Sequence, residues 1–501
     1  MKRSHLSLLF LSTLLGAFFR LYRLNADYVW FNDTFFRLTP ALEILKGVPV
    51  KFAPSMIGAT GVGLVSFLFS EDLFSVALVV CFAGIACIPL SYYFVLRLTK
   101  DERIAALTAL FVSINPTLVA LSKVLLWDIF VLLFFLTSGI IYLSFKEKET
   151  LPKGFLLAIS LFLLFTFKLP NILYALVFYF FLFYKYRFSI NKSKNLLASL
   201  LAYIFLMALF FYSFPDALDT FTRGGGPNFF IKESYVSLLV ATLKTLLSPL
   251  ASPKTSMAFH FDIGIDIFFI MGLLALIPIA FYFKSIKKIE DFFPLSSVLI
   301  ISLFFINFSG WSHRYIVVPL FLMLVFVSYG IIKIMEKERG FAFLIVAVCF
   351  LSSFGPLISL TGEWGESKSL AANHVATPLS LFNKTSELID LNNVEIVVSS
   401  YGRVFTYYKL KGEIDGEIVD FYSVEKEEML DITNNGIFEG KRVWYIEGWP
   451  DVFVFEGKDT IVYRENIESE FVLKNIYTSK EKIYVFDREY PPLIIYELYK
   501  K

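Results

Sequence analysis

The chain has 501 residues, of which 56% are hydrophobic and 58 are phenylalanine. Soluble domains average about 45–50% apolar residues, so this composition and a mean hydropathy of +0.65 exclude a soluble protein and indicate a membrane protein. The formal net charge of +2 gives no sign of a nucleic-acid-binding protein.

Apolar runs of membrane-spanning length, about 20 residues, recur from Leu6 to Leu360. The first run begins like a signal peptide, but no small-residue cleavage site follows it, so we expect an uncleaved helix. Clusters of Lys and Arg in short loops mark the cytoplasmic side, and one topology places all of them there, with the N-terminus inside. The predicted spans are about eleven, at 5–22, 74–97, 103–121, 126–145, 154–168, 171–185, 196–213, 263–283, 293–308, 315–334 and 341–360.

Two external segments, 24–73 and 214–262, are longer than simple loops. Each contains a weakly apolar stretch, at 54–70 and 235–250, which we expect to lie along the membrane, because a span at either place would invert every later basic cluster. The first segment also carries "NADYVWFNDTFFRLTPALEILKG", which reads as a helix start around Asp33. Glu43 and Lys46 of this amphipathic stretch are expected to face solvent.

The composition changes at Thr361, where charged residues become frequent and apolar runs shorten. "VEIVVSS" and "KRVWYIEGW" are typical of strands, whereas "FTYYKLKG" and "VEKEEMLDITNNG" read as helices that end at glycine. We therefore predict a polytopic α-helical membrane domain over 1–360 and a small extracytoplasmic α/β domain over 361–501.

Cysteine and glutamine usage add two minor indications. The three cysteines all lie inside apolar runs, which is typical of small core residues and not of disulfides or metal ligands. The chain has no glutamine but many Lys and Glu residues, and this composition is typical of proteins from thermophiles.

Ionisable residues in or beside membrane spans are costly, so they are candidates for function. The predicted topology gathers the candidates from distant loops at the external ends of nearly charge-free helices. They are Asp33 after the first helix, Lys123 and Asp128 between the third and fourth, Lys168 at the end of the fifth, and His313, Arg314 and Tyr315 before the tenth.

Each candidate has a structural alternative. Asp33 fits a helix N-cap as well as a catalytic carboxylate, and Asp128 could pair with Lys123, five residues earlier. Lys168 and Arg314 could extend along the helix to the membrane interface. His313 fits an ordinary interface histidine. The glycine-rich "RGGGP" at 223–227 lacks the lysine and helix of a nucleotide-binding loop.

Four sequence stretches taken together resemble a known family. A first helix ending in "FRLYRL" precedes an external aromatic loop with an acid, followed by "NPTLVALSKVLLWD", "FTFKLPNIL" and "HRYIVVPLFLMLV". This set resembles the GT-C membrane glycosyltransferases, in particular the protein O-mannosyltransferase-like and lipid A aminoarabinose transferase-like branch, over roughly residues 6–335. The family often has two adjacent acids in the first loop, whereas here Asn32 and Thr34 flank Asp33, so a role that needs a second carboxylate is in doubt.

The resemblance implies a polyprenyl-phosphate sugar, of the dolichyl-phosphate-mannose kind, as donor and a glycan, lipid or protein hydroxyl as acceptor. Such a transfer needs a base for the hydroxyl proton, and Asp33, desolvated by aromatic neighbours, fits that role. Asp128 is the other catalytic candidate, should Asp33 not be the base. Lys123, Lys168 and Arg314, with Tyr315, would bind the leaving lipid phosphate, and His313 stands in the same motif. No cofactor is required, and a divalent cation is compatible with this chemistry although nothing in the sequence indicates one.

Other classes fit less well. An oligosaccharyltransferase would share the architecture, but the Trp-Trp-Asp signature of that family is missing, and "EGWPD" at 447–451 is only a distant likeness. A transporter would place polar groups near the midplane and show internal repeats, whereas these charges lie at helix ends. A non-catalytic surface anchor would need only one membrane helix, whereas about eleven are predicted.

Overall fold

A computed structural model gives the arrangement of the chain. It describes residues 3–22, 24, 28–48, 50, 57–123, 125, 127–168, 171–185, 194–214, 277–279, 317–362, 376–399, 401–420, 440–448, 467, 471–480, 483–485, 488–490 and 493–500. The predicted spans at 263–283 and 293–308, apart from 277–279, the segment 235–250 and the predicted helix at 424–436 lie outside these residues.

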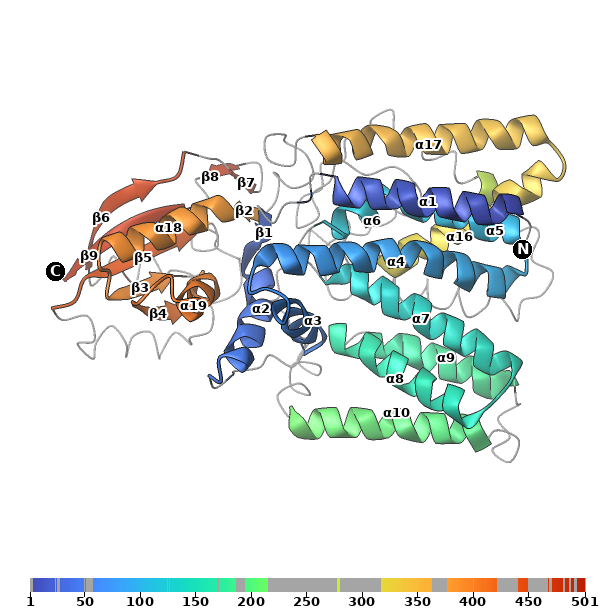
Figure 1. The fold of residues 1–501 in the computed structure, drawn as a ribbon, viewed down its shortest axis with the longest axis horizontal. Helices are drawn as coiled ribbons and strands as arrows, with labels where there is room; N and C mark the ends of the chain where they lie inside the picture. Colours follow the sequence, from blue (N-terminus) through green and yellow to red (C-terminus); the bar gives the residue numbers. More distant parts are fainter. Residues whose placement is uncertain are drawn as a thin grey trace.

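Long apolar helices run side by side through one half of the molecule (Figure 1). Their bounds agree with the predicted spans to within a few residues, apart from one break. The described helices of this half, with the short α6 that follows the break, are α1 (Arg3–Leu21), α4 (Leu73–Thr99), α5 (Glu102–Ile114), α6 (Pro116–Leu121), α7 (Asp128–Glu147), α8 (Leu151–Phe167), α9 (Ile172–Lys185), α10 (Lys194–Ser213), α16 (Val317–Met335) and α17 (Arg339–Gly362).

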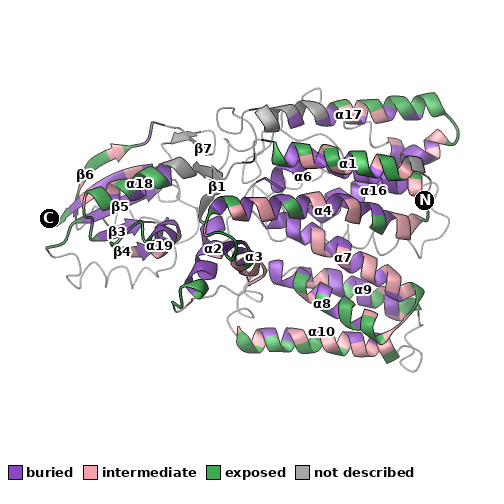
Figure 2. Cartoon of the chain, viewed as in Figure 1, coloured by how far each residue is buried: buried purple, intermediate pink, exposed green. Residues whose placement is uncertain are grey.

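The bundle has the burial pattern of a membrane protein. Helix α16 is buried almost throughout, whereas α1, α10 and α17 turn exposed faces outward (Figure 2). Those exposed faces carry large apolar side chains, such as Phe10, Phe205 and Phe343, which lipid would cover. By length and composition, four of the described helices, α4, α7, α10 and α16, can cross a membrane. The predicted fold class is confirmed.

The single helix predicted over 103–121 is wrong, because the chain breaks it in two. Helix α5 ends at Ile114, and Asn115 then caps the short α6 by accepting a hydrogen bond from the Leu118 amide at 2.9 Å. Pro116 has no N–H and disfavours a helical conformation in the residue before it. The Asn-Pro pair is therefore the physical reason for the break.

Two short helices lie between the bundle and the C-terminal domain (Figure 1). Helix α2 (Phe31–Leu45) contains Asp33, and α3 (Ile57–Phe67) forms most of the stretch 54–70. With 11 residues, α3 is about 16 Å long, which is too short for a hydrocarbon core of about 30 Å. The prediction that 54–70 does not form a full span agrees with this length.

The C-terminal domain is built on a five-stranded mixed sheet in the order β4-β3-β5-β9-β6. Strands β4, β3 and β5 are parallel, whereas β9 is antiparallel to both β5 and β6. Helices α18 and α19 complete the predicted α/β character. The elements are β2 (Ala376–Pro378), α18 (Leu379–Leu391), β3 (Ile396–Ser399), α19 (Gly402–Leu410), β4 (Glu417–Asp420), β5 (Val443–Gly448), β6 (Phe471–Thr478), β7 (Ile483–Val485), β8 (Arg488–Tyr490) and β9 (Leu493–Lys500).

The two halves are joined through α2, α3 and a short ladder. Strand β1 (Tyr28–Trp30), just before α2, pairs antiparallel with β2 of the C-terminal domain. Phe35 of α2 packs against Tyr407 of α19, with ring centroids 5.3 Å apart. The Tyr407 hydroxyl donates to the Glu71 carbonyl at 2.9 Å, and Thr39 Oγ1 donates to the Arg403 carbonyl at 3.0 Å. The C-terminal domain therefore holds the helix that carries Asp33.

Candidate active site at the domain-facing helix ends

A buried arginine holds the broken end of α5. Arg20, at the end of α1, is fully buried, and its Nη2 donates to the Val112 carbonyl at 3.2 Å. In an unbroken helix the amide of residue 116 would bond that carbonyl, but Pro116 has no N–H. Arg20 Nη1 donates to the Ser113 carbonyl at 3.0 Å and Nε to Ser122 Oγ at 3.1 Å. One guanidinium thus fixes α1, α5 and the loop after α6.

Lys123 follows directly in that loop and is also buried. Its Nζ donates to the carbonyl of Tyr22, just past the end of α1, at 2.8 Å. Carbonyls at a helix C-terminus lack helical partners and carry partial negative charge, so a cation is favoured there. The contact fixes the loop 122–127 against α1.

Asp128 and Lys168 form an ion pair in the structure. Helices α7 and α8 form an antiparallel hairpin, so the first residue of α7 and the residue after α8 meet at the same end. Asp128 is 1% exposed and Lys168 is 14% exposed. The structure thus gives each of these two residues a partner 40 residues away in the sequence.

Aromatic residues directly precede both members of this pair in the sequence, Trp127 before Asp128 and Phe167 before Lys168. Phe130 and Phe167 stack with centroids 5.3 Å apart and an interplanar angle of 3°, and Trp127 packs against Phe130 at 6.3 Å. Apolar surroundings strengthen the attraction between opposite charges and raise the cost of leaving either charge alone. The pair is therefore a fixed feature of this helix end.

Thr34 connects α2 to the same loop. Its Oγ1 donates to the Leu125 carbonyl at 3.1 Å, and Thr34 is fully buried. Leu125 lies between Lys123 and Asp128 in the sequence. The backbone of Asp33, one residue before Thr34, is therefore held close to the loop that carries two of the other candidates.

Helix α2 begins at Phe31, directly after β1. Asp33 is therefore the third helical residue and not the residue before the helix, which excludes the N-cap alternative. A carboxylate in the first turn still complements the positive end of the helix dipole. The side chain of Asp33 lies outside the described residues, as do His313, Arg314 and Tyr315 entirely.

Glu43 and Arg403 form a further contact between α2 and α19. Their closest charged atoms, Glu43 Oε1 and Arg403 Nη1, are 3.6 Å apart, and both side chains are largely buried. Burial raises the pKa of Glu43, and the charge of Arg403 opposes that rise. The expectation that Glu43 faces solvent is wrong, because α19 covers that face of α2. Lys46 is exposed and pairs with Glu71 at 2.8 Å.

Three residues with a role at this helix end were not identified from the sequence: Arg20, Thr34 and Arg403. Arg20 carried a usable signal, since a charged residue inside an apolar run requires buried partners. Thr34 and Arg403 carried none, because their partners are backbone and side-chain atoms far away in the chain. Among the described residues, no group of three or more His, Cys, Asp or Glu could hold a metal ion.

Comparison with known proteins places this geometry in context. Residues 63–223 match the family model of dolichyl-phosphate-mannose-protein mannosyltransferases, a range that contains Lys123, Asp128 and Lys168. No curated protein matches the sequence.

Solved structures share the fold along nearly the whole chain. ArnT from Cupriavidus metallidurans in the apo state aligns with a TM-score of 0.59 and 10% identity over 98% of this chain and 97% of its own. ArnT bound to undecaprenyl phosphate aligns with a TM-score of 0.57, 10% identity and coverage of 99% and 98%. The oligosaccharyltransferase AglB from Archaeoglobus fulgidus, in complex with an inhibitory peptide and a dolichol-phosphate, aligns with a TM-score of 0.53, 12% identity and coverage of 89% and 69%. The expected resemblance to GT-C proteins is confirmed.

Proposed function

We propose that this chain, a multi-pass membrane glycosyltransferase of the GT-C fold, transfers a sugar from a polyprenyl-phosphate donor to an acceptor hydroxyl at the bundle end that faces the C-terminal domain. The family match is to enzymes named for dolichyl-phosphate-mannose. Structural neighbours are bound to undecaprenyl phosphate and to dolichol-phosphate. As part of the proposal, we assign the same class of donor, a polyprenyl phosphate, to this chain.

The observation that carries the proposal is the Thr34–Leu125 hydrogen bond together with the Asp128–Lys168 pair. These two contacts gather elements from α2, the loop after α6, α7 and α8 at one helix end. Glycosyl transfer needs a base near the acceptor and cations near the departing phosphate, and this end carries both residue types.

In the proposed reaction the Asp33 carboxylate takes the proton of the acceptor hydroxyl. The hydroxyl oxygen bonds to the sugar C1 while the bond from C1 to the phosphate oxygen breaks, through a state with oxocarbenium character. Lys168, Lys123 and Arg314 balance the charge that returns to the lipid phosphate. We assign Asp128 a positioning role and not that of a base, because its carboxylate pairs with Lys168.

The experiment that tests the base is Asp33→Asn in purified, reconstituted protein, supplied with polyprenyl-phosphate mannose and glucose and candidate acceptors. Loss of a general base costs about 10²–10⁴-fold in rate, so the variant is expected to be folded and nearly inactive. Asp72→Asn is the matched control, because Asp72 caps α4 through the Phe74 amide and Asn caps about as well. Wild-type turnover in Asp33→Asn would remove Asp33 from the mechanism.

We further propose that the membrane domain ends near residue 360, that the N-terminus is cytoplasmic and that residues 361–501 lie outside the cell membrane. The basic residues at the ends of α4, α7, α9 and α16 and at the starts of α5 and α17 support this orientation, since these helix ends lie opposite the C-terminal domain (Figure 1). Protease added to sealed right-side-out cells should release the C-terminal domain. If the protease leaves the C-terminal domain intact, the proposed orientation in the membrane is wrong.

An oligosaccharyltransferase-like activity is the second candidate, favoured by the fold shared with AglB. The chain spans nearly all of ArnT but about 70% of AglB, and it lacks a Trp-Trp-Asp stretch. Transfer of a preassembled oligosaccharide to an asparagine-containing peptide, with no transfer from single-sugar lipid phosphates, would favour this candidate.

A further inference from the structure

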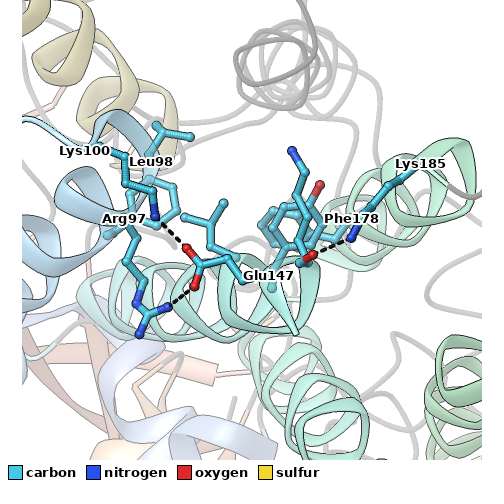
Figure 3. Close-up of a pocket in the computed structure, with 10 residues that line it drawn as sticks. Arg97, Leu98, Lys100, Glu147, Phe178 and Lys185 are labelled. Carbon is cyan, nitrogen blue, oxygen red and sulfur yellow. Dashed lines mark hydrogen bonds and ion pairs between the residues drawn. The ribbon is translucent and has the colours of Figure 1, made fainter. Parts of the chain in front are cut away.

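A charged cavity lies at the opposite end of the bundle from the candidate active site. It has a volume of about 270 Å³ and is formed where α4, α7 and α9 end (Figure 3). Its lining residues are Phe94, Arg97, Leu98, Lys100, Tyr142, Leu143, Lys146, Glu147, Phe178 and Lys185. Asp128 and Glu147 begin and end α7, so the two sites are about 29 Å apart along the bundle.

The lining is strongly cationic. Among the described residues that form it, four are basic and one, Glu147, is acidic. Arg97 Nη1 contacts Glu147 Oε2 at 2.9 Å and Lys100 Nζ contacts Glu147 Oε1 at 2.6 Å, so one carboxylate gathers two of the cations (Figure 3). An arginine carries five N–H donors and a lysine three, which one carboxylate does not exhaust.

Two further cations come from other helices. Lys146 is in the last turn of α7, and Lys185, the last residue of α9, donates a hydrogen bond to the Lys146 carbonyl. The contact draws the end of α9 against the end of α7. Three predicted loops thus contribute their basic residues to one cavity.

The aromatic part of the lining lies deeper along the same helices. Phe94 precedes Arg97 by three residues, Tyr142 precedes Lys146 by four, and Phe178 precedes Lys185 by seven. On helices these offsets are about 5 to 10 Å toward the bilayer centre. Tyr142 and Phe178 stack with centroids 4.9 Å apart. A ligand here would meet cations at the membrane surface and rings directly beneath.

We propose that this cavity binds the phosphate headgroup of an anionic phospholipid in the leaflet opposite the active site. A lipid phosphate matches both halves of the cavity, because its charge fits the basic rim and its glycerol and first methylenes fit the aromatic floor. Basic pockets between membrane helices are suited to anionic headgroups. The inference does not depend on the proposed reaction, since it needs only the membrane domain. The cavity is too far from the other helix end to share a lipid phosphate with it.

The test is lipid retention by the purified full-length protein. The protein is exposed to vesicles of phosphatidylcholine containing phosphatidylglycerol, and bound lipid is counted by native mass spectrometry. Wild type is expected to retain phosphatidylglycerol in clear preference to phosphatidylcholine. Lys146→Gln, which keeps the carbonyl that Lys185 bonds, should weaken phosphatidylglycerol binding about tenfold, as expected for one lost charge-assisted contact.

Lys148→Gln is the matched control. Lys148 is exposed, lies two residues further along the chain and is not part of the lining. It removes the same charge, so equal loss in both variants would show non-specific attraction and overturn the proposal. Equal retention of the two lipids by wild type would also overturn it. So would full displacement of phosphatidylglycerol by millimolar inorganic phosphate, because the cavity would then be a site for the free ion.

Discussion

The Asp128–Lys168 pair allows structural and catalytic roles to be separated by mutation. Replacing Lys168 by Met removes the cation and leaves Asp128, 1% exposed, as a buried charge without this partner. At about 4 Å and an effective dielectric constant of about 20, two unit charges attract by about 4 kcal/mol, and loss of one partner of a buried pair typically costs about 3–5 kcal/mol. Lys168→Met should therefore lower the free energy of unfolding by about that amount.

The reverse variant, Asp128→Asn, should cost less, because Lys168 is 14% exposed and its ammonium can still reach solvent. The double variant should recover most of the stability lost in Lys168→Met, since no charge is left alone. Stability is measured as the midpoint of denaturation in detergent, and donor binding is measured on the same preparations.

A purely structural pair predicts that the double variant regains both stability and donor affinity. A phosphate-binding Lys168 predicts that stability returns while donor affinity stays about tenfold or more below wild type, the cost of one charge-assisted hydrogen bond of about 1.5–3 kcal/mol. Unchanged stability in Lys168→Met would refute the ion pair itself. Restored donor affinity in the double variant would remove Lys168 from the phosphate site.

Three further perturbations test one contact between the two halves, one contact inside the helix bundle and one inside the C-terminal sheet. Arg403→Met leaves Glu43 without its opposing charge, so the pKa of Glu43 should rise further. Turnover is expected to fall, while hydrogen exchange shows that the C-terminal sheet is still folded. Wild-type turnover in this variant would argue against positioning of α2 by the C-terminal domain. Arg20→Met leaves two buried carbonyls of α5 without the guanidinium donor. Each unsatisfied carbonyl should lower the free energy of unfolding by about 1–3 kcal/mol. An unchanged denaturation midpoint would contradict this expected loss of stability. Hydrogen bonds from Tyr499 and then Arg442 hold the pKa of Glu497 below its usual range. The ionised Glu497 therefore stabilises the folded state at pH values above its unfolded pKa of about 4.3. This stabilisation is lost as the pH falls through the lower pKa of the folded state. Hydrogen exchange of the β9 amides, corrected for intrinsic rates, should become faster in acid in the wild type. The increase should be smaller in Glu497→Gln.

Local features of the sequence were sufficient to predict most of the described membrane helices and the class of protein. Apolar length predicts a membrane helix without reference to its neighbours, because lipid forces each span to satisfy its own backbone hydrogen bonds. The bounds of α1, α4, α7 and α10 were therefore predictable to within a few residues. The α/β character of the C-terminal domain followed from strand and helix patterns of similar length. The break at Asn115–Pro116 was also visible in the sequence, and the apolar run across it outweighed the proline in the prediction.

Partner choice was decided only by the tertiary structure. The sequence marked Asp128 and Lys168 as unusual charges but suggested a neighbour five residues away for the former, whereas the α7–α8 hairpin supplies one 40 residues away. Glu43 was predicted to be exposed because its helix is amphipathic, and the C-terminal domain covers that face instead. A membrane span is determined by one stretch of chain in contact with lipid, whereas the environment of a charge depends on how several stretches pack, which no single stretch of sequence contains.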